Sequence, residues 1–232
     1  MAGVITLHHP SGQVFGFDAG TLCLELVCTT GGEGFRARFE VLHSPADIAT
    51  WAALSRLDLA GHGVDPAEVD TRPEHLADLK RLREAIWSIA FGVATTGTDG
   101  SPGGSPSPGG RVTGEGTAAS GGRLGAFGAE LAVVNELAAG RGLVPRLDPA
   151  TGAAGWQRPV DAGQFVTEIA RDAVRTFGTT AIDRVRRCAG DNCALLYLDT
   201  SRPGQRRWCS MQRCGNRHKV AGHRRRQQTA TP

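Results

Sequence analysis

Residues 184–226 read RVRRCAGDNCALLYLDTSRPGQRRWCSMQRCGNRHKVAGHRRR, and the rest of the chain is best understood from this stretch. Its four cysteines form two pairs, Cys188 with Cys193 and Cys209 with Cys214, each with the spacing C-x4-C. Fifteen residues separate the pairs, a length that suits one β-hairpin. Two matched thiol pairs in a short basic segment indicate a metal site first and nucleic-acid binding second.

The composition points to a soluble protein. The chain has 232 residues, enough for a medium-sized domain plus a small one. Its first residues lack a basic leader and a long apolar run, and the most apolar stretch, 22–27, is far too short to span a bilayer. We therefore expect a cytoplasmic protein, in which clustered cysteines bind metal more often than they form disulfides.

The charge is distributed unevenly along the chain. Residues 184–226 hold 12 Arg and Lys against two acids, Asp191 and Asp199, a net charge of +10. The remainder holds 26 − 12 = 14 basic and 23 − 2 = 21 acidic residues, a net charge of −7. Two parts of opposite sign are expected to have different partners.

The sequence before residue 180 predicts a mainly helical domain, 1–180. Helical periodicity or helix-start signals mark four segments, and weaker patterns mark short strands. The expected helices begin at 45, 72, 124 and 162, and the last runs to 177. The expected hairpins lie within 3–17 and between 143–146 and 156–160, while 21–27 fits either a helix or a strand. The fold class is therefore α+β, mainly α with short β-hairpins.

Two segments are predicted to lack regular structure. Residues 95–122 are dense in Gly, Ser, Pro and Thr and have almost no large apolar side chain, which predicts a flexible insertion. A phosphate-binding loop is excluded there because no GK[ST] follows the glycines. The last residues, 227–232, are expected to form a disordered tail.

A third C-x4-C pair, Cys23 and Cys28, lies in the apolar run near the N-terminus. Without a turn between them, these thiols lie on opposite faces of a strand or about 140° apart on a helix. They are therefore predicted to be packed core thiols. Cys188 and Cys193 differ because Gly190, Asp191 and Asn192 supply a turn.

A closed tetrahedral zinc site would use Cys188, Cys193, Cys209 and Cys214. The first pair would flank a knuckle, 194–199 and 205–208 would form a hairpin around the loop 201–204, and the second pair would start a basic helix running to 226. This order of knuckle, hairpin and helix is similar to a treble-clef zinc module. Four thiolates leave no position for water, so the single Zn²⁺ is expected to be structural.

Other uses of these residues stay open at this stage. Four structural or redox cysteines without metal are one alternative, and an iron–sulfur cluster is disfavoured because its ligands are usually grouped more tightly. His218 lies one helical turn beyond Cys214 and is a rival ligand. Trp208 and Tyr197 are expected to pack the hairpin core rather than stack on bases.

The segment resembles the CGNR zinc-finger family. The resemblance covers about forty residues and includes the pieces LDTS at 198–201, RRWCS at 206–210 and CGNR at 214–217. More weakly, the N-terminal region resembles the ABATE domain found upstream of this finger. The resemblance implies a stress-induced transcriptional regulator that binds DNA. The chain departs from the LDFVNT-like motif of that domain, because Glu25 and Cys28 replace its acid and amide.

The function expected from these features is DNA-binding transcriptional regulation by a zinc finger, 184–226, with domain 1–180 as a sensor of a small-molecule effector or a protein-interaction module. A zinc-stabilised protein-interaction or RNA-binding module is the alternative. No catalytic motif is present, so an enzyme is not expected. The residues expected to contact nucleic acid are Arg206, Arg207, Arg213, Arg217, Lys219, Arg224, Arg225 and Arg226.

Overall fold

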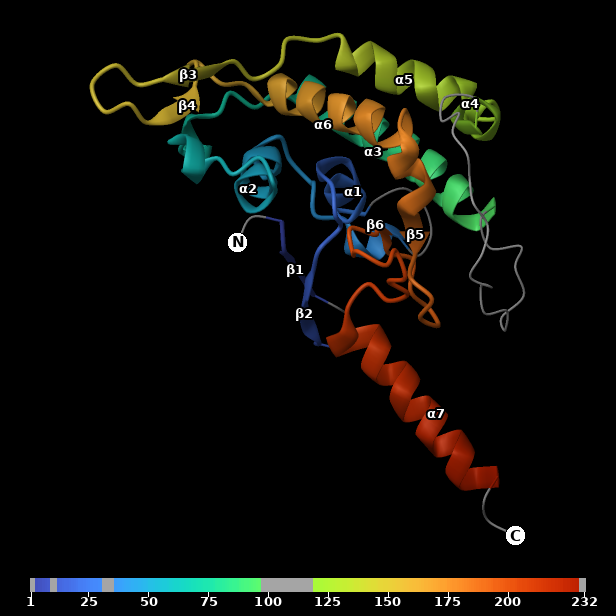
Figure 1. The fold of residues 1–232 in the computed structure, drawn as a ribbon. Coiled ribbons are helices and arrows are strands. Elements are labelled where there is room, and N and C mark those ends of the chain that lie inside the picture. The colour runs from blue at the N-terminus through green and yellow to red at the C-terminus, as the bar shows by residue number, and fades with distance from the viewer. Residues whose placement is uncertain (1–2, 9–11, 31–35, 97–118, 230–232) are drawn as a thin grey trace.

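The computed structural model describes residues 3–8, 12–30, 36–96 and 119–229. Three long helices, α3 (Pro73–Thr96), α5 (Gly128–Ala138) and α6 (Ala162–Phe177), pack against one another as one layer. The short helices α1 (Leu22–Val27) and α2 (Ala46–Leu54) lie beneath that layer, and α7 (Asn216–Thr229) extends away from it (Figure 1). The mainly helical α+β prediction is confirmed.

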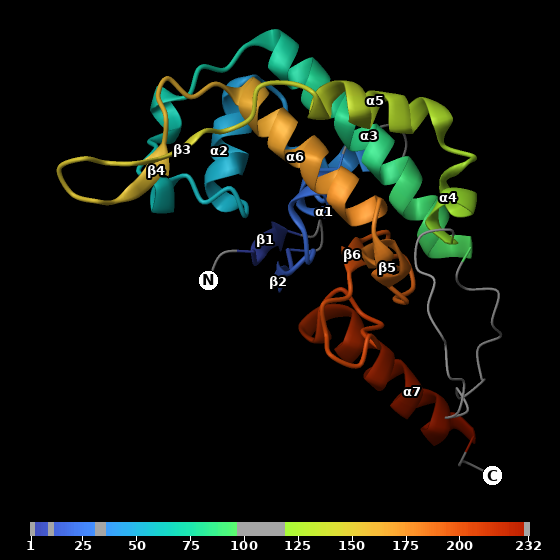
Figure 2. The same ribbon diagram turned by 45° about the horizontal axis from the view of Figure 1, so that its top comes forward.

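Within the described ranges, three two-stranded antiparallel sheets accompany the helices. They pair β1 (Ile5–His8) with β2 (Val14–Phe17), β3 (Pro145–Leu147) with β4 (Ala154–Trp156), and β5 (Val185–Arg187) with β6 (Leu196–Leu198). The remaining helical elements are α4 (Ala119–Leu124), η1 (Arg36–Phe39), η2 (Ala60–His62), η3 (Pro66–Glu68), η4 (Thr180–Arg184) and η5 (Met211–Gly215). The view in Figure 2 shows β5 and β6 below the helical layer, between it and α7.

Helix α6 has the bounds that its sequence predicts. Asp161 accepts a hydrogen bond from the backbone of Gln164, and the Gln164 side chain accepts one from the Asp161 backbone, so a capping box starts the helix. Apolar residues at helical spacing, among them Phe165, Ile169 and Phe177, are buried. A good cap and one apolar stripe therefore determine this element locally.

The two segments predicted to be irregular are helical where the structure describes them. Helix α3 continues to Thr96 and α4 begins at Ala119, so both ends of 95–122 are helical, and 97–118 lies outside the described residues. Helix α7 continues to Thr229, so the tail prediction is wrong for 227–229, because Gln227 and Gln228 are good helix formers. Residues 230–232 lie outside the described part of the chain.

The C-terminal finger and the helical domain share one hydrophobic core. That core contains the four finger cysteines together with residues of α1, α3 and α6. The backbone N–H of Leu198 donates to the carbonyl of Ala19 at 2.9 Å, which joins β6 to the segment before α1. Gly20 lies so close that a Cβ there would be 2.4 Å from the Leu198 carbonyl oxygen. The two parts on either side of the expected boundary near residue 180 therefore pack together without a gap in the core.

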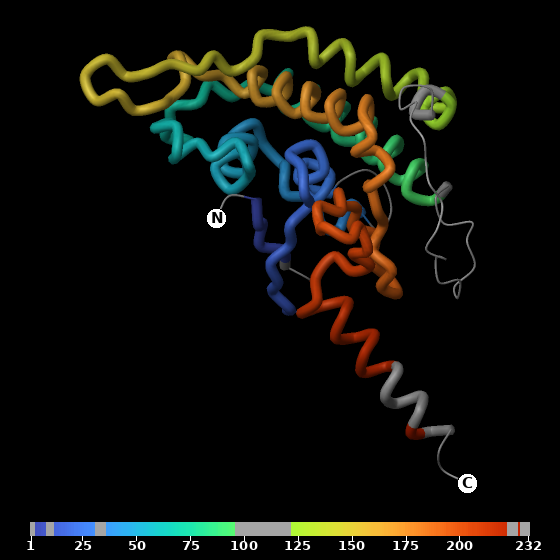
Figure 3. The backbone as a smooth tube through the Cα atoms, in the orientation of Figure 1, coloured from blue at the N-terminus to red at the C-terminus, as the bar shows by residue number. Residues whose placement is uncertain are grey.

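The β1–β2 hairpin also contacts the finger. In Figures 1 and 3 it lies beside the start of α7. Arg206 donates to the carbonyl of Asp18 at 2.9 Å, and the Arg213 guanidinium lies 4.8 Å from the ring of Phe15. No helix in the described residues is long and apolar enough to cross a membrane.

Candidate metal centre and basic helix

The first cysteine pair lies in the loop of the β5–β6 hairpin. Val185 pairs with Leu198 and Arg187 with Leu196, so Cys188 follows one strand and Cys193 precedes the other. Asn192 has φ 56°, a left-handed conformation that asparagine tolerates, and the N–H of Cys193 donates to the Gly190 carbonyl at 3.1 Å. This tight turn brings the two thiols to one side.

The predicted hairpin of 194–199 with 205–208 is wrong. Within that range only Leu196–Leu198 is a strand, and it pairs with Val185–Arg187, which precede the knuckle. Leu196 and Tyr197 are fully buried. Arg206 and Arg207 belong to no strand; their carbonyls accept hydrogen bonds from the Tyr197 hydroxyl and the Ala189 N–H. The loop 188–195 of the observed hairpin is longer than the predicted loop 200–204, so loop length does not explain the pairing; the turn at Asn192 and the cysteine cluster hold this loop instead.

The second cysteine pair lies at the start of the C-terminal helix. Cys209 precedes η5, a single π-type turn, Cys214 lies within that turn, and α7 follows. The N–H of Gly215 donates to the Ser210 carbonyl at 3.1 Å and closes the turn. The second pair therefore flanks a helix start, as the sequence predicts, but the regular helix begins at Asn216.

The four sulfur atoms lie within 4.8 Å of one another. Cys209 Sγ is 3.8 Å from Cys193 Sγ and 3.6 Å from Cys214 Sγ. A zinc ion with four sulfur ligands at about 2.3 Å requires sulfur separations of about 3.8 Å, so the cluster has the dimensions of a tetrahedral site. All four residues are buried. The donor set and the spacing fit one structural Zn²⁺.

Neighbouring N–H groups are directed at the sulfurs. The backbone N–H of Cys209 donates to Cys188 Sγ at 3.2 Å, and the Arg217 guanidinium donates to Cys214 Sγ at 3.2 Å. Because this hydrogen bond favours the charged guanidinium, it raises the pKa of Arg217. Such donors stabilise thiolates and partly offset the net −2 charge of a zinc ion with four thiolates.

Gly190 is required at the knuckle for space. A Cβ at this position would lie 2.7 Å from Cys214 Sγ and 3.0 Å from Cys214 Cβ. The backbone of the first pair therefore touches the second pair directly, and the two halves of the site fit closely without a side chain between them. The sequence marks Gly190 only as a turn residue, so this packing role was missed.

His218 lies outside the sulfur cluster. Its ring is 4.8 Å from the ring of Trp208, and the side chain is exposed. Tyr197 is fully buried and its hydroxyl donates to the Arg206 carbonyl at 2.6 Å. Tyr197 therefore packs the finger core as predicted, whereas His218 has the position of a surface residue.

Two of the arginines expected to contact nucleic acid point inward. Arg213 is only 6% exposed, and its Nη1 lies 3.9 Å from Cys193 Sγ. Arg206 stacks at 4.1 Å over the Tyr197 ring and donates to the carbonyls of Trp208 at 3.0 Å and Cys209 at 2.6 Å. The prediction that these two arginines contact nucleic acid needs correction, because their guanidinium groups contact other residues of the finger.

The other expected contact residues remain on the surface or on the projecting helix. Arg207, Arg217 and Lys219 are exposed. Arg224, Arg225 and Arg226 continue α7, and the structure describes only their backbone. The Arg217 side chain at the start of α7 is exposed, and one of its guanidinium nitrogens also donates to the sulfur of Cys214.

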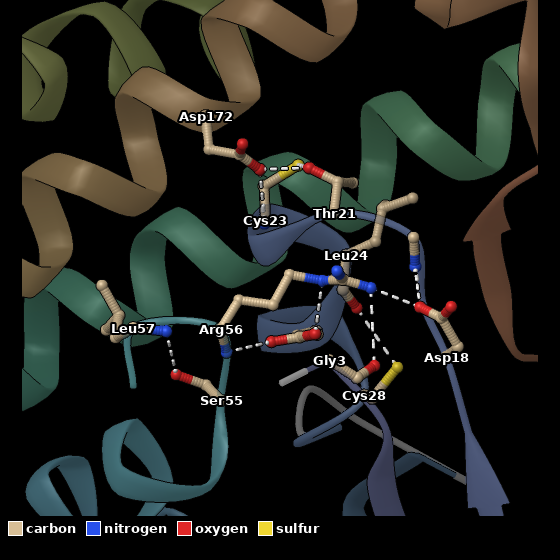
Figure 4. Close-up of polar contacts among 12 residues, drawn as sticks. Gly3, Asp18, Thr21, Cys23, Leu24, Cys28, Ser55, Arg56, Leu57 and Asp172 are labelled. Atoms are coloured by element: carbon tan, nitrogen blue, oxygen red, sulfur yellow. Dashed lines mark hydrogen bonds and ion pairs between the residues drawn. The ribbon is translucent and has the colours of Figure 1, made fainter. Parts of the chain in front are cut away.

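A second polar cluster surrounds α1 (Figure 4). Glu25 is fully buried, accepts from the Arg56 backbone at 2.9 Å and lies 2.7 Å from Arg56 Nε. The Cys28 thiol donates to the Leu24 carbonyl at 3.1 Å. Asp172 accepts from the N–H of Cys23 at 2.8 Å. Cys23 and Cys28 are buried free thiols, as predicted.

Glu25 should make stability depend on pH. Burial raises its pKa from 4.5 to about 7, although hydrogen bonds from Arg56 lower it. Between these two pH values the folded chain keeps a proton on Glu25 that the unfolded chain releases. The free energy of unfolding should therefore fall as the pH rises from 4.5 to about 7, by up to about 3 kcal/mol. Denaturant unfolding should show Glu25→Gln gaining stability relative to the unchanged protein over this range; a pH-independent difference would contradict this.

This fold and centre define a zinc-finger protein: one closed four-cysteine site lies between a hairpin knuckle and a basic helix. Residues 184–227 match the CGNR zinc finger, and residues 20–180 match ABATE, described as "Putative stress-induced transcription regulator". The second match covers more than half of the chain, so the protein belongs to the ABATE family. No curated protein matches the sequence.

Proposed function

We propose that this protein is a DNA-binding transcriptional regulator in which α7 contacts the duplex. The observation that carries the proposal is the form of α7: its sequence is basic, its residues 216–221 are exposed, and it projects from the body (Figure 1). Its sequence contains five basic residues and no acid. Helical side chains of this charge can follow a line of phosphates.

The described side chains of helix α7 pack little against the body. The main packing partner of the helix is the preceding turn η5, and residues 216–221 are exposed. A helix of this length that is polar on every side is only marginally stable in water. The zinc centre holds its first turn, and a polyanion along its length would satisfy its charge. This supports nucleic acid as the partner.

The acidic body would face away from the duplex. Residues outside 184–226 carry a net charge of −7, which phosphate repels. We propose that this body senses an effector or contacts a protein, and that the zinc ion is structural rather than catalytic because four thiolates complete its coordination. On this account the protein is not an enzyme.

Competition between polyanions tests the proposal. Zinc-loaded protein would be titrated into a labelled mixed-sequence DNA duplex at near-physiological salt, with unlabelled duplex, single-stranded RNA and polyglutamate as competitors. We expect duplex DNA to compete at least about tenfold better than polyglutamate per charge. Equal competition by polyglutamate would contradict DNA binding and favour an acidic protein partner, and stronger competition by RNA would favour an RNA-binding module.

A further inference from the structure

A cavity of about 540 Å³ lies between the helical body and the zinc knuckle. The body contributes residues of β1, β2, α1, η1 and α3, and the knuckle contributes 192–196, including the zinc ligand Cys193. Ligand sites for small molecules are commonly of this size and lie where two parts of a protein meet. The walls are mainly apolar, with Phe15, Val27, Trp87 and Leu195 among them.

The charged groups in the walls are mostly cationic. Arg36, Arg38 and Arg213 face a single acid, Glu40. Glu40 is already paired with the buried Arg83 at 2.7 Å. Arg36 is paired with Glu84 at 2.9 Å and lies over the Trp87 ring at 4.3 Å.

Two cations therefore remain without a carboxylate partner. Within the part of the chain that the structure describes, neither Arg38 nor Arg213 forms an ion pair with an acidic side chain.

Two residues of the cavity lining each carry a buried polar atom that has no hydrogen-bond partner among the described residues. These atoms are Nε of Arg213 and the hydroxyl oxygen of Thr30. A buried N–H left unpaired costs about 1–3 kcal/mol, so the Arg213 guanidinium keeps unused hydrogen-bonding capacity beside the cavity. Thr30 also has φ 56°, an unusual conformation for a β-branched residue and one that is found more often at functional sites.

We infer that this cavity binds a small organic monoanion, a carboxylate on an aromatic or other apolar body. The apolar walls and Trp87 would take the body of the ligand, and Arg213 and Arg38 would take the carboxylate. The ligand would then contact the knuckle and the helical body together. This deepens the sensor role proposed above and rests on the proposed function only for its effect on DNA.

Arg213 gives the ligand a route to the DNA-binding helix. It belongs to η5, which leads directly into α7, and its Nη1 is directed at Cys193 Sγ. An anion bound to its guanidinium would bias the position of the turn that leads into α7. Coupling between two binding sites is reciprocal. If the ligand changes the affinity of the protein for DNA by some factor, bound DNA must change the affinity for the ligand by the same factor.

The test is calorimetric titration of the zinc-loaded full chain with 2-naphthoate and with 2-naphthylmethanol, a neutral analogue of the same shape. We expect saturable naphthoate binding and at least about tenfold weaker binding of the alcohol. Arg213→Gln should weaken naphthoate binding about tenfold and Arg38→Gln about threefold, with the alcohol unaffected. Arg146→Gln, an exposed arginine on β3, is the matched control and should change neither.

The outcomes separate this inference from the proposed function, since the titration contains no DNA. No naphthoate binding at about 1 mM, or equal binding of the alcohol, would overturn the anion site. If Arg213→Gln loses zinc, the comparison of naphthoate with the alcohol and the Arg38→Gln variant still test whether the cavity binds an anion. A changed duplex affinity at saturating naphthoate supports the coupling. An unchanged duplex affinity with naphthoate bound would overturn the coupling and leave the anion site standing.

Discussion

Cys214→Ser should abolish stable zinc binding and loosen more than the finger. The hydroxyl is a poor zinc ligand, and the three remaining sulfurs would stay close together without the full coordination of the ion. We expect zinc content to fall from one ion per chain to nearly none, and the free energy of unfolding to fall by about 3 kcal/mol or more. Metal analysis after gel filtration and denaturant unfolding measure both.

The loss should extend into the body because the core is continuous. Leu198 bonds Ala19, and Arg206 joins the Cys209 carbonyl to the Asp18 carbonyl, so disorder in the finger releases the β1–β2 hairpin. Amide hydrogen exchange should rise in β1, β2 and the segment before α1, and stay low in α6. Cys28→Ser, at a buried thiol that is not a ligand, should keep its zinc.

Two results would contradict this account. Full zinc retention by Cys214→Ser would remove Cys214 from the ligand set. Zinc loss with unchanged exchange in the β1–β2 hairpin would show that the finger unfolds alone, as a module independent of the body.

Neutralising the exposed cations of the finger should weaken DNA binding and its salt dependence. The variant combines Arg207→Gln with Lys219→Gln, both exposed and neither bonded to a zinc-site sulfur. If each contacts one phosphate, the slope of log affinity against log salt should fall in magnitude by about 1.8, and affinity near physiological salt by roughly ten- to a hundredfold. Fluorescence anisotropy with a labelled duplex at four salt concentrations measures both.

The matched control removes the same charge from the opposite end of the molecule. Arg141→Gln with Arg146→Gln changes two exposed arginines near β3. This variant should bind DNA with unchanged slope, or slightly more weakly from the change in net charge. Equal effects of the two pairs would show that net charge alone decides affinity, which would contradict a specific role for the finger surface.

Arg213 and Arg217 contact the zinc site, although their sequence spacing suggests a pair of phosphate contacts. Spacing places them one helical turn apart, but Arg213 is buried and Arg217 is bonded to Cys214 Sγ. Replacing either would disturb the zinc centre as well as any phosphate contact. The inward direction of a guanidinium depends on distant acceptors and rings, so a count of charges along the chain does not reveal it.

Local signals were sufficient for the metal site and the best helices. Two C-x4-C pairs and a turn between the first two cysteines predicted the ligands, because a small zinc module is built from short-range spacings. The capping box of Asp161 and Gln164 and the apolar stripe of α6 are equally local. Where adjacent residues carry the physical cause, the sequence shows it directly.

Long-range contacts explain what the sequence did not show. The pairing of Leu196–Leu198 with Val185–Arg187 was missed because either neighbouring segment could supply a strand. The contact between Leu198 and Ala19 joins residues at opposite ends of the chain, and the cavity between body and knuckle is lined by residues equally far apart in the sequence. No periodicity or motif records such contacts.

Selection of the zinc-loaded protein on a randomised duplex library at near-physiological salt tests the central claim most directly, that this zinc finger reads DNA. We expect an enriched motif, recovered by the unchanged protein and lost by Cys214→Ser, and a two-fold symmetric motif would indicate a dimeric regulator. A library that emerges with no enriched sequence would contradict sequence reading and leave only electrostatic attachment to phosphate.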